Sequence, residues 1–294
     1  MKSPIQKILV TGSSGYLGST LVSLLEESYE VTGIDIAPSP TTHKLVDLTN
    51  KEAVIEACKG QDAVIHTAAL HAPHVHIHSR EAFIDTNIKG TLYLLEAARE
   101  HKIKRFIFSS STSVYGKSLV NHHQAVWVTE EVAPRGRDIY DITKLAAEGL
   151  CEDFFDTSSM ATLSLRVSRF WKEPLPDKLW YRLYRGLDVQ DAASAHELAL
   201  HFSADQFEVF NISGESPFLP DEVETLFHNP TQLLRQKASA MLPFFEEMGW
   251  EVPKQIDRVY VIDKAKKLLG YRPTHSYLSL IEEIRKENNE NRQL

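Results

Sequence analysis

A tyrosine and a lysine lie four residues apart in the run Tyr140-Asp141-Ile142-Thr143-Lys144. In a helix, positions i and i+4 share one face, so the phenol and the ammonium can reach a common point. A nearby cation favours the phenolate, and the spacing therefore predicts that Lys144 lowers the pKa of Tyr140 from its usual value of about 10. Such a phenol can act as a general acid or base toward a carbonyl or alcohol oxygen. A packed ring and a solvated amine give the same pattern, so the rest of the chain has to decide.

The N-terminal region predicts a site for a dinucleotide. A mostly apolar strand, residues 7–11, runs into a glycine-rich turn and then into the leucine pattern of a helix. Glycines let the backbone approach a pyrophosphate, while a helix N-terminus offers free N–H groups and a partial positive charge. The spacing is G-x-x-G-x-x-G, and a bare glycine triplet can also be only a tight connection. The turn residues expected to contact the cofactor are Gly12, Gly15, Tyr16, Leu17 and Gly18.

Asp35 ends the next predicted strand, 35 − 18 = 17 residues after the last glycine. A carboxylate about 20 residues on, at the tip of the second strand, suits a ribose 2′-hydroxyl and repels a 2′-phosphate. Residues 36–43 contain no Arg or Lys that would accept that phosphate. The sequence therefore predicts NAD in preference to NADP. The alternative for Asp35 is a simple turn residue before Pro38 and Pro40.

These residues resemble the extended short-chain dehydrogenase/reductase family, which includes nucleotide-sugar epimerases and dehydratases. Seven motifs in the family's order carry the resemblance over about the first 170 residues. They are the glycine turn, Asp35, Asp47-Leu48, His66-Thr67-Ala68-Ala69, Asn87 with Gly90-Thr91, the run Ser109 to Gly116, and the pair of Tyr140 and Lys144. The resemblance implies that the cofactor is also contacted by Asp47, Leu48, Ala68, Ala69, Asn87, Tyr140 and Lys144.

By the same resemblance, a hydroxyl at the end of the strand before Tyr115-Gly116 hydrogen-bonds the substrate oxygen. Ser111 and Ser113 can both point into that crevice, and counting back from Gly116 selects Ser111 as the catalytic residue, with Ser113 kept as a substrate contact. The implied chemistry is hydride transfer, with Tyr140 shuttling the proton and Lys144 also bonding the nicotinamide ribose. The alternative for the serines is an ordinary strand-to-loop exit.

Departures from the family narrow the chemistry. Relatives that dehydrate sugars carry T-D-E where this chain reads Ser111-Thr112-Ser113, so a 4,6-dehydratase is disfavoured. Oxidoreduction of an alcohol or ketone remains, on a sugar-like or acidic small molecule. Epimerisation of a sugar or nucleotide sugar through a transient ketone is the first alternative. A non-catalytic NAD-sensing protein is the second, although the intact Ser111, Tyr140 and Lys144 argue against it.

The substrate side also departs from nucleotide-sugar enzymes. Arg169 stands where they carry an Asn for the diphosphate, and only residues 170–186 separate it from the next family-like element. We read this as a reduced substrate lobe for a smaller substrate. Arg169, with Arg182 and Arg185, could supply a fork for a carboxylate or phosphate. Pairing with surface acids is the alternative.

The order of elements predicts an α/β fold. Strand and helix patterns alternate through residue 167, including one long helix expected at 81–101. Such alternation implies a doubly wound, mostly parallel sheet, with the ligand in the crevice beyond the strand carboxyl ends. We expect residues 1–167 plus 187–213 to form the NAD-binding Rossmann domain. Residues 168–186 plus 214–294 would form the smaller substrate lobe.

Composition constrains location and partners. The chain has 294 residues and a net charge of −8 without a basic run, which disfavours nucleic acid. The absence of an 18-residue apolar stretch disfavours a membrane span. Cys58 and Cys151 fall in helical patterns, which favours buried thiols in a reducing, cytoplasmic compartment. The expected partner is a small-molecule substrate, and the resemblance implies a homodimer through the helices at 81–101 and 138–156.

Histidines crowd one stretch of the chain, at positions 66, 71, 74, 76 and 78. An H-x-H-x-H run can bind a metal, but no acid or cysteine completes the set, and Pro73 marks a loop. We therefore predict no functional metal. Contact between one of these imidazoles and the substrate is the alternative.

Overall fold

The structure, a computed structural model, describes residues 5–158, 160–203 and 205–291. Seven strands of the described chain form one sheet in the order β3-β2-β1-β4-β5-β7-β8, and every neighbouring pair is parallel. The strands are β1 (Lys7–Thr11), β2 (Glu30–Asp35), β3 (Lys44–Leu45), β4 (Ala63–His66), β5 (Arg105–Ser111), β7 (Ala161–Val167) and β8 (Glu208–Ile212). The order reverses direction between β1 and β4, which is where open α/β sheets hold their ligands. The predicted doubly wound parallel sheet is confirmed.

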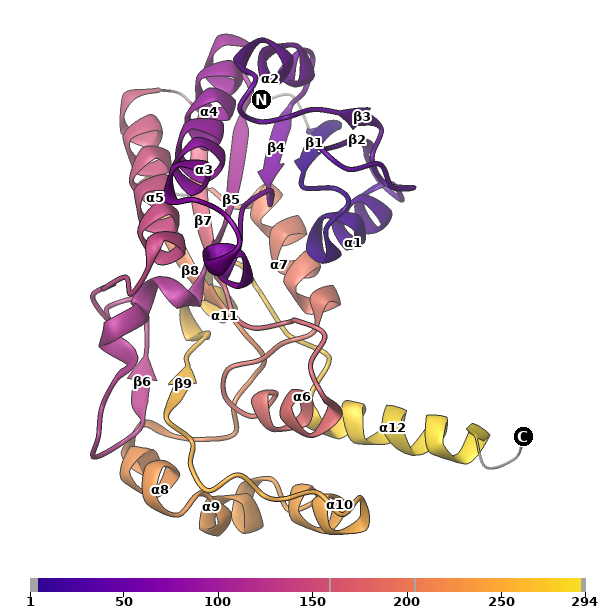
Figure 1. Cartoon of the computed structure of the whole chain (residues 1–294), viewed down its shortest axis with the longest axis vertical. Coiled ribbons are helices and arrows are strands. Elements are labelled where there is room, and N and C mark those ends of the chain that lie inside the picture. The colour runs from indigo at the N-terminus through magenta and orange to yellow at the C-terminus, as the bar shows by residue number, and fades with distance from the viewer. Residues whose placement is uncertain (1–4, 159, 204, 292–294) are drawn as a thin grey trace.

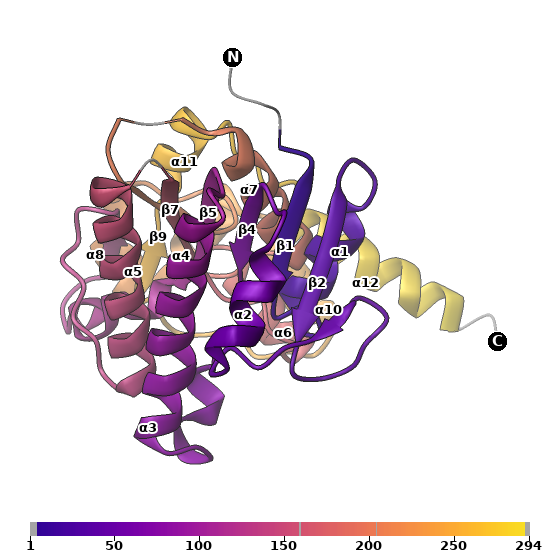
Figure 2. The ribbon, with the colours of Figure 1, turned by 90° about the horizontal axis from the view of Figure 1, so that it is seen from above.

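Helices cover both faces of the sheet, as Figure 2 shows from above. One face packs against α1 (Tyr16–Leu25) and α7 (Val189–His201). The other packs against α2 (Lys51–Cys58), α4 (Gly90–Glu100) and α5 (Ile139–Thr157). Both cysteines are buried free thiols in this second layer, as predicted.

The long helix expected at 81–101 is interrupted. It consists of α3 (Arg80–Phe83), a π-helical segment η2 (Ile84–Lys89) and α4. The segment contains Asn87, which is buried and hydrogen-bonds both the backbone of Leu70 and the hydroxyl of Thr143 in α5. Such π-helical turns are common at functional sites.

A smaller part of the molecule lies beyond the carboxyl ends of the strands, in the lower half of Figure 1. Its core is aromatic and aliphatic, with Trp180, Phe244 and Phe245 at its centre. Its elements are η3 (Thr112–Leu119), α6 (Leu175–Tyr181), η4 (Pro220–Glu222), α8 (Val223–His228), α9 (Pro230–Lys237), α10 (Met241–Glu247) and α12 (Tyr277–Asn291). A two-stranded parallel sheet joins β6 (Val126–Val128) to β9 (Arg258–Tyr260), and α11 (Asp263–Leu268) returns to lie beside β8.

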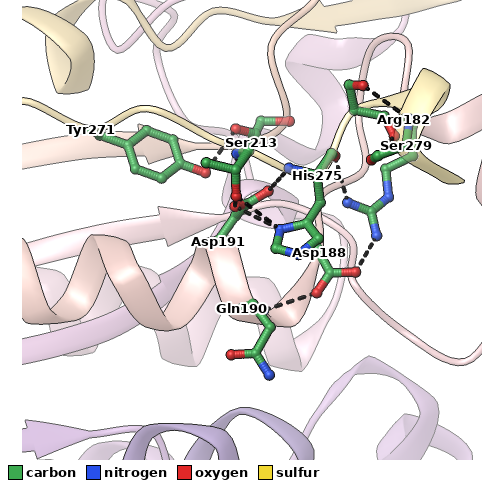
Figure 3. A network of polar contacts seen from close by, with 10 residues as sticks. Arg182, Asp188, Gln190, Asp191, Ser213, Tyr271, His275 and Ser279 are labelled. Atoms are coloured by element: carbon green, nitrogen blue, oxygen red, sulfur yellow. Dashed lines mark hydrogen bonds and ion pairs between the residues drawn. The ribbon is translucent and has the colours of Figure 1, made fainter. Parts of the chain in front are cut away.

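Buried charges join the two parts at the start of α7, and Figure 3 shows this network. Arg182 donates to the carboxylate of Asp188 at 2.5 Å and to the carbonyl of His275 at 3.0 Å. One turn further along, Asp191 accepts backbone N–H bonds from Thr274 and His275 at 2.9 and 3.1 Å. The C-terminal segment is thereby fixed to the helix that covers the sheet.

Candidate active site

The glycine turn lies against the end of β4 and leaves no room for side chains. Gly12 has φ +72°, and a Cβ there would stand 2.7 Å from the backbone nitrogen of Ala68. A Cβ on Gly18 would stand 2.0 Å from the carbonyl oxygen of Gly12. The N-terminus of α1, at Gly15, has no side-chain cap and no acidic residue in its first turn. Its N–H groups are therefore free for an anion, and the turn fits the pyrophosphate of a dinucleotide.

Asp35 lies at the mouth of this turn. Its carboxylate accepts the N–H of Ser14 at 3.0 Å and the N–H of Ala37 at 3.0 Å. It therefore ties the tip of β2 to the glycine turn. Contact between Asp35 and a cofactor ribose stays a prediction.

The other residues expected around the cofactor divide into exposed and packed ones. Tyr16 is 42% exposed at the start of α1, whereas Leu17 and Leu48 are buried in the core. Asp47 accepts hydrogen bonds within its own turn. Ala69 follows Ala68 just past β4, and both are partly exposed at the sheet edge.

His66 is a structural residue. The hydroxyl of Thr91 donates to the carbonyl of Asn87, so it accepts from Nε2 of His66 at 2.9 Å. Nδ1 of His66 then accepts from the Thr11 hydroxyl at 2.7 Å. Burial lowers the pKa of His66 to about 3 and keeps the ring neutral. Both ring nitrogens are used within the fold.

Tyr140 lies in the first turn of α5, where Asp138 caps the helix by accepting the N–H of Asp141 at 3.1 Å. The phenol is buried and hydrogen-bonded by Ser111 at the end of β5. Burial raises the pKa of Tyr140 to about 12, the hydrogen bond from Ser111 lowers it, and the charges of Asp141 and Asp138 raise it. The predicted lowering by Lys144 is wrong for this state, because the loss of hydration outweighs the favourable contacts.

Lys144 lies one turn further along α5 and is 2% exposed. Its Nζ donates to the carbonyl oxygen of Ser109 at 2.8 Å and lies 4.6 Å from the centre of the Phe108 ring. Burial lowers the pKa of Lys144 to about 7, against the opposing charge of Glu148. The ammonium is therefore easily deprotonated in this pocket.

The two candidate serines have different environments. Ser111 accepts the backbone N–H of Ser113 at 3.1 Å and also bonds Tyr140. The Ser113 hydroxyl is buried, and within the described residues it has no hydrogen-bond partner. A buried hydroxyl without a partner is costly, so a ligand group is its natural complement.

The three arginines do not form one fork. Arg182 is buried and fully engaged by Asp188 and His275, and Arg185 stacks 4.1 Å from the ring centre of Tyr181. The Arg169 side chain is 54% exposed and forms an ion pair with Glu173. It lines a pocket of about 210 Å³ together with the side chains of Tyr16, Trp171, Lys172 and Lys178.

Sequence reasoning missed the position of His71. Its ring lies 6.0 Å from the ring of Tyr140, at an interplanar angle of 53°. The crowd of histidines was visible in the sequence, but the tilt of one of them over the phenol was not. The available signal was its place: His71 follows β4 at the same sheet edge where Ser111 ends β5.

Residues 8–171 match the NAD dependent epimerase/dehydratase family. The chain belongs to this family. Its cofactor is therefore NAD, and the glycine turn and the uncapped α1 N-terminus are the features that fit it.

Two dehydrogenases are among the named relatives. The chain is 33% identical over 184 residues to a 3-beta-hydroxysteroid dehydrogenase of Mycolicibacterium neoaurum, covering 58% of this chain and 49% of that protein. It is 30% identical over 179 residues to a uronate dehydrogenase of Pseudomonas putida, covering 58% and 64%. The match thus spans about half to two thirds of the length of these curated relatives.

Solved structures share the fold over nearly the whole chain. A short-chain dehydrogenase/reductase superfamily protein of Agrobacterium tumefaciens, solved with bound NAD, aligns with a TM-score of 0.73 and 20% identity, covering 98% of this chain and 100% of that one. A mutated uronate dehydrogenase aligns with a TM-score of 0.66 and 22% identity, covering 96% and 86%.

Two further findings concern metal binding and membrane spans. Among the described residues, no group of three or more histidines, cysteines and acids is arranged to hold a metal ion. Across the same ranges, no helix combines the length and the apolar character needed to cross a bilayer.

Proposed function

We propose that this protein is an NAD-dependent oxidoreductase that interconverts an alcohol and a ketone on a small sugar-like or acidic molecule. The observation that carries the proposal is the buried Tyr140 phenol, bonded by Ser111 and one helical turn from Lys144, in a chain with an intact dinucleotide cradle. NAD supplies the redox chemistry when it is bound.

The protein's own side chains orient the substrate oxygen and transfer its proton. With its pKa raised to about 12, Tyr140 is a neutral phenol at physiological pH and can donate its proton to a ketone oxygen. Ser111 orients that oxygen, and the free hydroxyl of Ser113 offers a second hydrogen bond. In the reverse direction, deprotonated Tyr140 accepts the proton of the alcohol. Lys144, one helical turn away, is held by the bond from its Nζ to the Ser109 carbonyl oxygen.

The pocket beside Tyr16 supports an acidic substrate. Arg169, Lys172 and Lys178 bring positive charge to it, and exposed Trp171 offers a flat apolar face. A carboxylate or phosphate would compete with Glu173 for the guanidinium of Arg169. A uronate dehydrogenase is among the relatives, which is in keeping with an acid.

We assign residues 1–167 plus 187–213 to the NAD-binding domain and residues 168–186 plus 214–294 to the substrate lobe. The separate core around Trp180 and Phe244 supports this division. Two segments cross it: β6 pairs with β9 of the lobe, and α11 packs against the sheet.

The direct test measures absorbance at 340 nm while the protein and NAD are offered sugar acids, neutral sugars and nucleotide sugars. A dehydrogenase produces NADH with one of these classes. An epimerase shows no net change in NADH, but NMR of the sugar reveals the inverted centre. Tight NAD binding without either reaction would instead favour the NAD-sensing protein.

We also propose a cytoplasmic homodimer. The buried thiols Cys58 and Cys151 suit a reducing compartment. On the adjoining η2 and α5 segments, Ile84 is 40% exposed and Ile142 is 53% exposed, which suits a helical interface. Sedimentation of the wild type and of Ile142→Arg tests this: the substitution should convert a dimer to a monomer, and a monomeric wild type would contradict it.

A further inference from the structure

Four aromatic rings form a line from the buried phenol to the protein surface. The centres of Tyr140 and His71 are 6.0 Å apart, those of His71 and His74 5.9 Å, and those of His74 and His78 5.7 Å. His71 and His74 are partly buried, and His78 is exposed. Ring centres at this spacing are in contact, so the line has no gap in it.

The fold holds the inner end of this line firmly. Asn87 accepts the N–H of Leu70 at 2.8 Å and donates to the Leu70 carbonyl at 3.0 Å. Its amide also donates to the Thr143 hydroxyl at 3.0 Å. The residue directly before His71 is thus fixed to the helix that carries Tyr140. The π-helical segment η2 places Asn87 for this role.

The outer histidines are ordered by the short η1 turn (Ala72–His76). The N–H of His71 donates to Nδ1 of His74 at 3.0 Å, so a neutral His74 carries its proton on Nε2. The N–H of His78 donates to the carbonyl of His74 at 3.0 Å, which keeps these two rings together.

The charges around the line favour neutral rings. Burial, Lys144 and His74 lower the pKa of His71 to about 4. Burial and His78 also lower the pKa of His74. A neutral imidazole can accept a proton at one nitrogen while it releases one from the other, and therefore passes protons without holding a charge.

We propose that His71, His74 and His78 relay protons between the Tyr140 hydroxyl and solvent, an inference that rests on the proposed function. When Tyr140 gives its proton to a ketone oxygen, the relay returns one proton from water at His78. Each imidazole gains one N–H bond and loses one, and His74 turns its ring to free Nδ1 from the His71 N–H as it does so. The only net change is a proton moved from water to the phenolate. Alcohol oxidation runs the same path outward. Single waters or ring rotations bridge the nitrogens.

This relay bears on which reaction the protein performs. Oxidation of an alcohol to a free ketone releases one proton to solvent per turnover, whereas an epimerase takes its proton back. A dedicated path from Tyr140 to solvent is therefore of use to a dehydrogenase.

The test follows the Tyr140 hydroxyl itself, in protein without substrate. Tyrosine labelled with ¹³C at Cζ reports by NMR how fast that hydroxyl exchanges with D₂O, and Tyr140→Phe identifies the signal. His71→Phe keeps a ring of similar shape but removes both nitrogens. We expect it to slow the exchange by roughly tenfold or more. His76→Phe, an exposed position on the same turn, is the matched control and should leave the rate unchanged.

A second measurement separates a relay from a merely structural role. In His71→Ala, added imidazole should restore exchange and, with a substrate in hand, turnover. An exchange rate in His71→Phe that is unchanged or faster, or no response to imidazole, would overturn the relay and leave the proposed function intact. A wild type that oxidises no alcohol with NAD, yet shows slowed exchange in His71→Phe, would overturn the dehydrogenase instead.

Discussion

The sheet side and the join to the smaller lobe differ in the sequence range of their buried polar contacts. On the sheet side, Lys144 bonds the Ser109 carbonyl and Asn87 bonds the Leu70 backbone, and Arg166 and Glu148 form a buried ion pair. At the join, Arg182 donates to the carbonyl of His275 and Asp191 accepts from Thr274, each more than eighty residues away. Contacts between such distant residues leave no local pattern in the sequence. The cofactor side could therefore be read from its motifs, and the substrate side could not.

The largest expected effect is a loss of turnover with NAD binding left intact. Tyr140→Phe removes the proton donor, and turnover should fall by about 10³-fold or more. NAD affinity, measured by fluorescence or calorimetry, should stay within about twofold, since the glycine turn is untouched. An equal loss of NAD binding would show that the two functions are not separable in this way.

The next largest effect is on stability, through the buried ion pair of Arg182 and Asp188 where the two parts of the molecule meet. Arg182→Leu leaves the carboxylate of Asp188 without its partner, and breaking such a buried pair costs about 3 kcal/mol or more of unfolding free energy. Arg285→Leu is the matched control, because its pair with Glu247 is about half exposed and worth well under 1 kcal/mol. Urea denaturation compares them. Equal losses would mean that the buried pair contributes no more than a surface one.

The role of the glycine turn in NAD binding is tested by Gly18→Ala. The added Cβ would stand 2.0 Å from the Gly12 carbonyl, so the turn must shift, at a cost of about 1–3 kcal/mol. NAD binding should weaken at least tenfold. Gly149→Ala lies in α5 with nothing within 4 Å of the new Cβ and should leave binding unchanged. Normal NAD affinity in Gly18→Ala would remove the glycine turn from the site.

On the lobe side, Arg169→Ala should raise KM for an acidic substrate about tenfold with little change in kcat, since it removes binding rather than proton transfer. The same variant should treat the corresponding neutral sugar like the wild type. An equal effect on both substrates would assign Arg169 a structural role through Glu173.

A further prediction concerns the dependence of stability on pH, as a slope per pH unit. The pKa of Lys144 is about 7 in the folded chain and about 10.4 when unfolded. Between these values the unfolded chain holds the extra proton, so this lysine makes stability rise with pH, by at most about 1.4 kcal/mol per unit. Below pH 7 both states hold the proton, so stability stops changing with pH and the full cost of burying the ammonium remains. Lys144→Met should flatten the rise between pH 7 and 10 in denaturation curves, and an unchanged slope would contradict the assigned pKa.

Much of the sheet was predictable because apolar runs and glycine turns are local signals. The strand at residues 7–11 and the Tyr140 helix were found in this way. The π-helical segment was not, because its register follows from Asn87 reaching Leu70 across the fold. The pKa of Tyr140 was misjudged because spacing reveals a neighbouring charge but not the loss of water. The contact between the rings of His71 and Tyr140 could not be predicted, because it depends on the path of the loop after β4.

Asp191 has a consequence for how the chain is made. Within the described residues, this buried carboxylate accepts its hydrogen bonds from Thr274 and His275, more than eighty positions later. During synthesis on the ribosome, α7 therefore emerges before the residues that bond the Asp191 carboxylate have been made. We expect a nascent or truncated chain that ends at Tyr271 to stay sensitive to protease, because it lacks Thr274 and His275. Stable folding would then require these residues and not only the strands of the sheet.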